Sequence, residues 1–205
     1  ALIASGGVCP KRIITTGPDE GCRVWRRSTS EELTTDTYTP PEAVSWPGMD
    51  GGDVHGLFYN PQHVQFQGIQ MPPLMVLIHG GPTSQRGAVF DAEVQFFTTR
   101  GFAVLQVNYR GSSGYGRAYR DMLRGNWGVY DVEDAVSGAR HLVAQGRVDN
   151  GRLVIMGGSA GGFTVLKALE DYPGVFKAGV CLYGVANQFS LAADTHKFEE
   201  RYSDS

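Results

Sequence analysis

The pattern of apolar residues along the chain changes near Pro72. Downstream of it, continuous apolar runs at Leu74–Ile78 and Phe102–Val107 predict strands that are buried on both faces. Two further runs, at Leu153–Met156 and Ala178–Leu182, predict inner strands of the same kind. Such strands are typical of a mostly parallel sheet with helices on both of its faces.

Between these runs, apolar residues recur at the period of an amphipathic helix. One helix is predicted within residues 87–100, a second over Asp131–Gln145 and a third over Ala160–Glu170. The apolar stripe of the first consists of Phe90, Val94 and Phe97. Strands that alternate with helices indicate an α/β domain.

The first 42 residues have a different composition. Short strand-like pieces alternate with turns, and a Ser/Thr-rich stretch ends at Pro40-Pro41. We interpret residues 1–42 as the end of an upstream domain or a linker, and residues 43–205 as part of the α/β domain. The strands expected on either side of this boundary are Arg12–Thr16, Cys22–Arg26, Ala43–Trp46 and Val54–Tyr59, with an Asp-Gly hairpin signal before the last.

Composition narrows the classes of function. With 41% apolar and 19% charged residues among 205, the chain has the make-up of a folded globular protein. A net charge of −3 argues against a nucleic-acid partner, because duplex binders present a basic face. No apolar run approaches the ~18 residues of a membrane span, and residues 1–8 do not resemble a signal peptide. Because the chain begins with Ala, we expect a piece of a longer protein.

Three cysteines, Cys9, Cys22 and Cys181, are an odd number without C-x-x-C spacing. This pattern predicts neither a disulfide framework nor a metal site. We expect the three cysteines to act as small apolar residues of a cytoplasmic protein, and we expect Cys181 to be buried because it lies in an apolar run.

The strongest chemical signal is GGSAGG at residues 157–162, between an expected strand and an expected helix. It contains G-x-S-x-G, the pattern of a nucleophile elbow, whose small neighbours let the serine adopt a strained turn. Ser159 is the predicted nucleophile, at a helix N-terminus that favours developing negative charge. The alternative is a phosphate-binding turn, but the segment lacks the lysine of a P-loop and has serine at the third position of a Rossmann fingerprint.

A second signal, HGGP at residues 79–82, follows the expected strand Leu74–Ile78. Acyl transfer develops an oxyanion, which needs two hydrogen-bond donors at about 2.7–3.1 Å. The predicted donors are the Ala160 N–H, next to the nucleophile, and the Gly81 N–H in this loop.

The base and the acid of a triad are not evident. In this architecture the chain order is Ser, then Asp or Glu, then His, and only His196 follows Ser159. His196 and Asp194 lie just past the next expected strand, whereas the acid and the base normally come from later loops. We therefore expect both residues after position 205.

Four arginines follow the second buried strand: Arg110, Arg117, Arg120 and Arg124. They are a candidate clamp for a substrate carboxylate. The alternative is pairing with nearby acids, for which Asp121, Asp131 and Glu133 are available.

Four stretches give the sequence a specific resemblance: HGGPTSQ (79–85), NYRGSSGYGRAYRDMLRGNWGVYDVEDA (108–135), GGSAGGFTVL (157–166) and DTHKFEERY (194–202). Together they resemble the catalytic domain of the prolyl oligopeptidase family of serine peptidases, in its acylaminoacyl-peptidase and dipeptidyl-aminopeptidase branch. The resemblance covers roughly residues 43–205. It implies an α/β-hydrolase fold without its last strands, preceded by the end of a β-propeller in residues 1–42.

The resemblance also implies a chemistry, in which a peptidase cleaves short peptides through an acyl-enzyme on Ser159. Gly81 and Ala160 would supply the oxyanion donors, and Phe198 an aromatic wall of the substrate pocket, with Tyr183 as a further candidate. No metal or organic cofactor is implied. The expected partner is a short peptide, and a homo-oligomer of the complete protein is also considered. Two rival functions stay open: an esterase or lipase of the same fold, and a non-catalytic binding module, which the missing acid and base favour.

Overall fold

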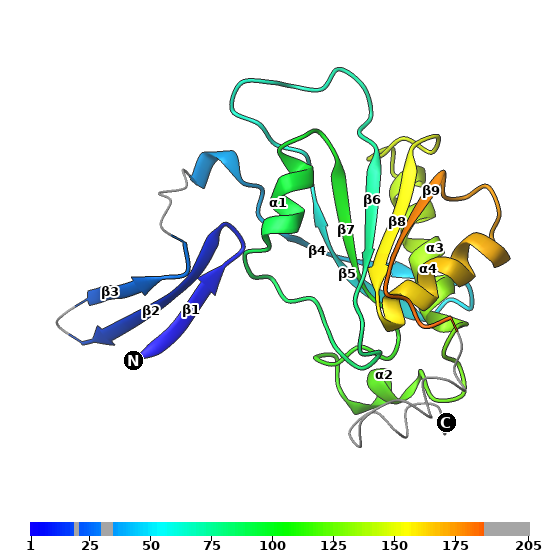
Figure 1. Cartoon of the computed structure of the whole chain (residues 1–205), viewed down its shortest axis with the longest axis horizontal. Coiled ribbons are helices and arrows are strands. Elements are labelled where there is room, and N and C mark those ends of the chain that lie inside the picture. Colours follow the sequence, from blue (N-terminus) through cyan, green and yellow to red (C-terminus); the bar gives the residue numbers. More distant parts are fainter. Residues whose placement is uncertain (19–20, 30–34, 187–205) are drawn as a thin grey trace.

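The computed structural model describes residues 1–18, 21–29 and 35–186, which form two β-sheets (Figure 1). The smaller is antiparallel and consists of β1 (Leu2–Gly6), β2 (Cys9–Gly17) and β3 (Gly21–Arg27). It stands to one side of the larger sheet, and a 3-10 turn, η1 (Thr35–Thr37), lies on the connection (Figure 1). Strands β2 and β3 contain the two predicted strand-like pieces, whereas the sequence pattern misses β1.

The larger sheet has six strands in the order β4-β5-β7-β6-β8-β9. Their bounds are β4 Glu42–Pro47, β5 Asp53–Tyr59, β6 Leu74–Ile78, β7 Ala103–Asn108, β8 Leu153–Gly158 and β9 Ala178–Leu182. The pairs β4–β5 and β5–β7 are antiparallel, while β7, β6, β8 and β9 run parallel. From β6 the chain moves to β7 on one side and then to β8 on the other. The carboxyl ends of β6 and β8 therefore form a topological switch point, where open α/β sheets bind ligands.

Helices cover both faces of this sheet (Figure 1). Helix α1 (Ala92–Thr98) lies on one face, and α3 (Tyr130–Ala144) and α4 (Ala160–Asp171) lie on the other. A short helix, α2 (Arg117–Asp121), follows β7. The expected α/β-hydrolase class, with a mostly parallel sheet between helices, is confirmed.

The apolar run of β6 serves two cores. Leu74, Val76 and Ile78 join the core shared with α3 and α4, whereas Met75 and Leu77 join the core shared with α1. Alternate side chains of a strand point to opposite faces, so a strand between two helical layers needs apolar residues at every position. This confirms the prediction of burial on both faces for this strand.

Helix α1 is shorter than its apolar stripe suggests. The Asp91 carboxylate accepts hydrogen bonds from the backbone N–H groups of Glu93 (3.0 Å) and Val94 (3.4 Å), and so caps the helix. The prediction that Phe90 belongs to the helical face is wrong, because this cap starts the helix after it. The Phe90 ring instead packs edge to face with Tyr38, with centroids 5.4 Å apart.

Strand β9 has a partner only on its β8 side within the described residues. All of its residues are exposed, including Val180 (38%) and Leu182 (41%). The expectation of a buried Cys181 is therefore wrong: the free thiol is exposed, and no described strand pairs with the edge of β9 that faces away from β8. An apolar strand with an open edge is a ready template for pairing with another segment.

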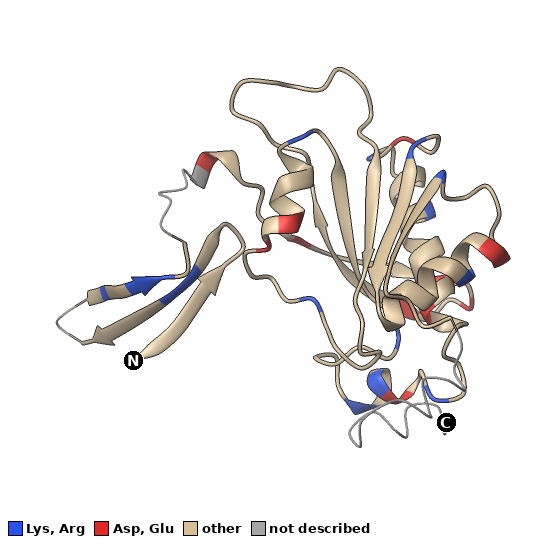
Figure 2. Ribbon diagram, viewed as in Figure 1, with Lys and Arg blue, Asp and Glu red and all other residues tan. Residues whose placement is uncertain are grey.

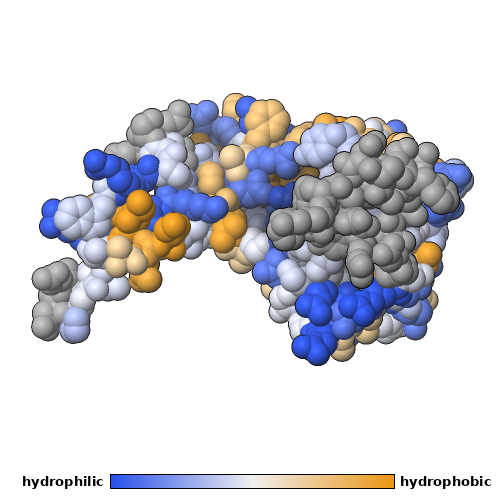
Figure 3. Space-filling model, turned by 60° about the horizontal axis from the view of Figure 1, so that its bottom comes forward, coloured by the Kyte–Doolittle hydropathy of each residue, from blue (hydrophilic) through white to orange (hydrophobic). Residues whose placement is uncertain are grey.

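The small sheet also has exposed apolar side chains. Leu2 is 56% exposed, and Ile3 (79%) and Ile13 (44%) are paired across β1 and β2, so the two isoleucines share a face. Figure 3 shows an apolar patch over this part of the molecule. In the described ranges, no helix combines the length and the apolar character that crossing a bilayer requires.

Candidate active site

Ser159 is a single residue between the end of β8 at Gly158 and the start of α4 at Ala160. Its backbone has φ 56° and ψ −123°, a conformation that residues with a Cβ rarely adopt. The side chain is exposed. The chain thus turns sharply and presents the hydroxyl at the N-terminus of α4, which is the geometry expected of a nucleophile elbow.

Close backbone contacts explain the glycines around this turn. A Cβ at Gly157 would lie 2.5 Å from the carbonyl oxygen of Gly161, and a Cβ at Gly161 would lie 2.5 Å from that of Ile78. Neither position has room for a side chain. The turn is further held by the Ser159 N–H, which donates to the Leu182 carbonyl oxygen at 3.0 Å. The contacts around Ser159 therefore hold its strained backbone conformation in place.

The HGGP loop, residues 79–82, follows β6 and lies against the elbow. A Cβ at Gly80 would lie 3.4 Å from the Ser159 Cβ and 3.9 Å from the Ala160 nitrogen. Gly81 is exposed, with φ +138°, and its N–H donates no hydrogen bond within the described residues. The neighbouring strands β6 and β8 thus bring the two predicted donor segments together. The role of Gly81 and Ala160 as oxyanion donors stays a prediction.

His79 does not serve Ser159 as a base. Its ring is buried, with Nδ1 2.9 Å from the Gly80 carbonyl oxygen and Nε2 2.8 Å from Ser112 Oγ. Burial lowers the pKa of His79 to about 4. In the part of the chain that the structure describes, no histidine or carboxylate hydrogen-bonds with the Ser159 hydroxyl.

Tyr183 is the one predicted substrate-binding residue that is described. It directly follows β9, has φ 40° and is 83% exposed. Its ring covers Gly158, since a Cβ at that glycine would lie 2.9 Å from the Tyr183 hydroxyl oxygen. Tyr183 therefore stands beside the nucleophile, and its contact with substrate stays a prediction. Three further candidates lie outside the described residues: Asp194, His196 and Phe198.

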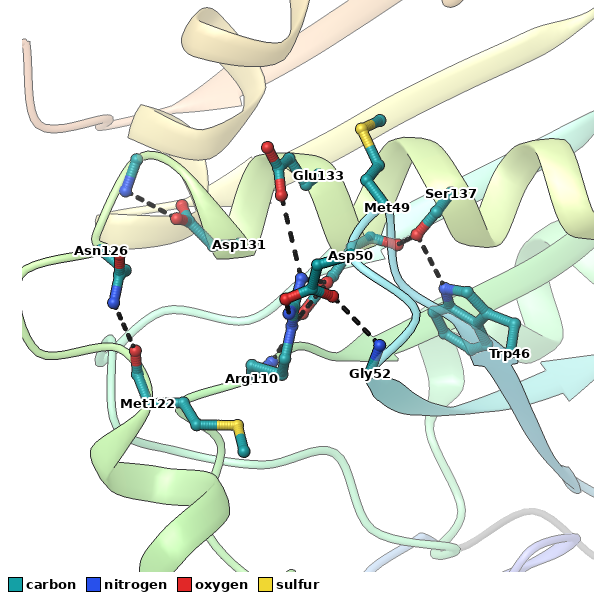
Figure 4. Close-up of polar contacts among 12 residues, drawn as sticks. Trp46, Met49, Asp50, Gly52, Arg110, Met122, Asn126, Asp131, Glu133 and Ser137 are labelled. Atoms are coloured by element: carbon teal, nitrogen blue, oxygen red, sulfur yellow. Dashed lines mark hydrogen bonds and ion pairs between the residues drawn. The ribbon is translucent and has the colours of Figure 1, made fainter.

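Arg110 pairs with acids and is not available as a clamp. It is 2% exposed, and its guanidinium donates to both carboxylate oxygens of Asp134 at 2.7–3.1 Å. It also donates to Asp50 on the β4–β5 hairpin at 2.6 Å (Figure 4). On the surface helix α2 (Figure 2), Arg120 pairs with Asp121 at 3.1 Å. Pairing is thus confirmed for both arginines, although Asp134 was not among the expected partners. The other two, Arg117 and Arg124, are exposed.

Asp131, at the start of α3 (Figure 4), pairs with no arginine among the described residues. Its buried carboxylate accepts hydrogen bonds from the Gly128 N–H at 2.6 Å and the Thr164 hydroxyl at 2.5 Å. Burial raises the pKa of Asp131 to about 6, and these two bonds oppose the shift. The expectation of an Asp131 ion pair is wrong: the carboxylate instead links α3 to α4, the helix that begins after Ser159.

Comparison with known proteins agrees with this geometry. The sequence profile of the Prolyl oligopeptidase family matches residues 88–205, more than half of the chain. The chain belongs to the prolyl oligopeptidase family.

This family member matches only part of the length of each of its relatives. It is 39% identical over 121 residues to dipeptidyl peptidase family member 6 of Caenorhabditis elegans, and 36% identical over 119 residues to dipeptidyl aminopeptidase BIII of Pseudoxanthomonas mexicana. Each alignment covers 58% of this chain, but 16% and 17% of the respective relative. A solved Mycobacterium tuberculosis puromycin-hydrolyzing peptidase superposes with a TM-score of 0.91 and 40% identity, over 98% of this chain and 31% of that one. The chain thus spans less than a third of the length of these relatives.

Sequence reasoning missed the residues that hold the HGGP loop and the segment directly after it. The Tyr109 hydroxyl donates to the Pro82 carbonyl oxygen at 2.7 Å. The Asn108 side chain accepts from the Arg86 N–H at 2.7 Å and donates to the Arg86 carbonyl oxygen at 3.0 Å. Both residues lie in the stretch 108–135 that carries the family resemblance, but their contact with this loop depends on which strand lies beside β6, and the sheet order decides that.

Proposed function

We propose that this chain carries the nucleophile and the oxyanion site of a serine-type peptidase that acts on short peptides. The observation that carries the proposal is the exposed Ser159 on a strained turn, beside a loop whose Gly81 N–H is unpaired within the described residues. Peptidase names among the relatives support the same chemistry.

The reaction follows from the geometry. Ser159 Oγ gives its proton to the triad base and bonds to the peptide carbonyl carbon, and the carbonyl oxygen takes up the negative charge that the Gly81 and Ala160 N–H groups stabilise. The C–N bond then breaks, the amine leaves with the proton that the base returns, and an acyl-enzyme remains for water to hydrolyse.

The proposal places the triad acid and base after residue 205. Chain order in this fold puts both after the nucleophile, and the chain spans less than a third of its relatives' length. Residues 1–205 alone should then react slowly with a fluorophosphonate, because a serine hydroxyl without a base is a weak nucleophile. Rapid labelling that His196→Ala abolishes would contradict this placement.

The proposal extends to the N-terminal segment and to the cellular compartment of the protein. Residues 1–42 are assigned to the end of an upstream β-propeller, which the separate antiparallel sheet and its exposed apolar side chains support. Free cysteines at positions 9, 22 and 181 fit a reducing cytoplasm.

The test compares the full-length protein with its Ser159→Ala and Ser137→Ala variants. A fluorophosphonate should label the parent and Ser137→Ala but not Ser159→Ala, and hydrolysis of a peptide anilide should follow the same pattern. A folded Ser159→Ala enzyme that keeps most of its activity would refute the proposal. If the parent hydrolyses a p-nitrophenyl ester but not the anilide, the result indicates an esterase. If the fluorophosphonate does not label the parent, the result indicates a binding module.

A further inference from the structure

The HGGP loop begins with a buried histidine, His79, which the proposed reaction does not use directly. His79 is 4% exposed, and its ring stacks on Tyr109 with centroids 4.4 Å apart and planes 19° from parallel. Because burial lowers its pKa to about 4, the ring is neutral near pH 7. A neutral imidazole has one N–H donor and one acceptor nitrogen, so the partners of the two nitrogens identify the tautomer.

Each ring nitrogen of His79 has one defined partner. Nδ1 lies 2.9 Å from the Gly80 carbonyl oxygen, which can only accept, so Nδ1 carries the hydrogen. Nε2 is then the acceptor, and it receives the hydroxyl hydrogen of Ser112 at 2.8 Å. Ser112 has no exposed surface, so its hydroxyl is committed to this bond and maintains the tautomer.

The Gly80 carbonyl belongs to the same peptide group as the Gly81 N–H. A trans peptide is planar, and its C=O and N–H point in opposite directions, so a bond that fixes one also fixes the other. Two adjacent glycines give this plane little steric restraint of their own. The Nδ1–H bond therefore determines where the Gly81 N–H points.

We propose that His79 and Ser112 form a positioning pair, in which Ser112 holds the tautomer of His79 and His79 orients the Gly80–Gly81 peptide toward the oxyanion. The inference rests on the proposed function, because it assumes that Gly81 donates to the reacting oxygen. Neither residue of the pair touches the substrate. A preoriented donor acts on the developing charge of the transition state, so its loss lowers kcat more than it raises KM.

Three variants of the full-length protein test the pair, with kcat and KM measured on a peptide anilide. His79→Phe keeps a ring to stack on Tyr109 but removes the Nδ1–H. We expect kcat to fall by about 10²-fold at nearly constant KM, as when one oxyanion donor is lost. His79→Asn places an amide N–H near the position of Nδ1–H and should recover most of this loss. Ser112→Ala should lower kcat less than His79→Phe does, because it frees the tautomer but leaves the ring.

Ser137→Ala is the matched control, since the Ser137 hydroxyl accepts the Trp46 indole N–H at 3.1 Å between α3 and β4, outside the loop. It should lower the melting temperature without changing kcat.

Two results would overturn the pair: a folded His79→Phe enzyme with parental kcat, or a loss of kcat that His79→Asn does not recover. If His79→Phe fails to fold, an unchanged kcat in Ser112→Ala is decisive against the positioning pair. Inactivity of Ser159→Ala in the same assay keeps these outcomes distinct, because only an active Ser159→Ala enzyme counts against the proposed function itself.

Discussion

Replacing Asp134 with leucine should destabilise the fold far more than the same change at a surface acid. The Asp134 side chain has no exposed surface, and that of Arg110 is 3% exposed. Burial by itself would lower the pKa of Arg110, but hydrogen bonds to Asp134 and Asp50 raise it, so the guanidinium stays charged. Asp134→Leu leaves this buried cation with the half-exposed Asp50, with Glu133 at 3.9 Å and with the face of the Tyr130 ring at 3.8 Å.

The magnitude follows from the groups left without partners. Removing one member of a buried ion pair costs about 3–5 kcal/mol. Asp134 also accepts the backbone N–H of Arg110 at 2.8 Å, and an orphaned buried N–H costs about 1–3 kcal/mol. Because Asp50 still neutralises part of the charge, we expect a net loss of about 4 kcal/mol in the free energy of unfolding. The double variant Arg110→Met/Asp134→Leu removes the buried charge and should lose only the N–H contribution, about 1–3 kcal/mol.

Urea unfolding of the full-length protein near pH 7 measures both values. Asp121→Leu is the matched control: Asp121 pairs with Arg120 at 3.1 Å, but the two side chains are 34% and 43% exposed. Loss of such a surface pair costs about 0–1 kcal/mol. The reasoning is refuted if Asp134→Leu costs no more than Asp121→Leu, or if the double variant is less stable than Asp134→Leu alone.

Three other expectations follow from the structure. Burial raises the pKa of Asp131 from 3.8 to about 6. The stability that the protonated form contributes is therefore complete below pH 3.8 and is lost as the pH rises through 6. The loss in the free energy of unfolding amounts to about 3 kcal/mol in all. Asp131→Asn should flatten the stability profile between pH 4 and 7, and an unchanged profile in urea unfolding would contradict the burial argument. Gly157→Ala should lower the free energy of unfolding by about 1–3 kcal/mol, because its Cβ would lie 2.5 Å from a backbone oxygen. Gly87→Ala, with open space around it, should be neutral or slightly stabilising. Equal melting temperatures of the two variants would contradict this expectation. Residues 1–205 alone should self-associate through the apolar edge strand β9, and a monodisperse monomer in sedimentation velocity would show that the edge is covered.

The features that depend on local periodicity and local chemistry could be predicted from the order of amino acids. The continuous apolar run of β6 indicated a strand between two helical layers, because both of its faces lie in a core. G-x-S-x-G between a strand and a helix indicated the turn at Ser159, because only small neighbours tolerate such close backbone contacts. These signals lie within a few residues of each other, so the sequence displays them directly.

Which distant residues meet became visible only in the folded chain. Arg110 pairs with Asp134, 24 positions away, and not with the nearer Asp131, whose carboxylate faces α4. His79 meets Ser112, 33 positions away, because β7 lies beside β6 and the segment after β7 lies behind the HGGP loop. Cys181 is exposed although its strand is apolar, since β8 pairs with one side of β9 and no described segment pairs with the other. Such partners depend on the order and the edges of the strands, and those arise from packing of the whole sheet, which no local pattern records.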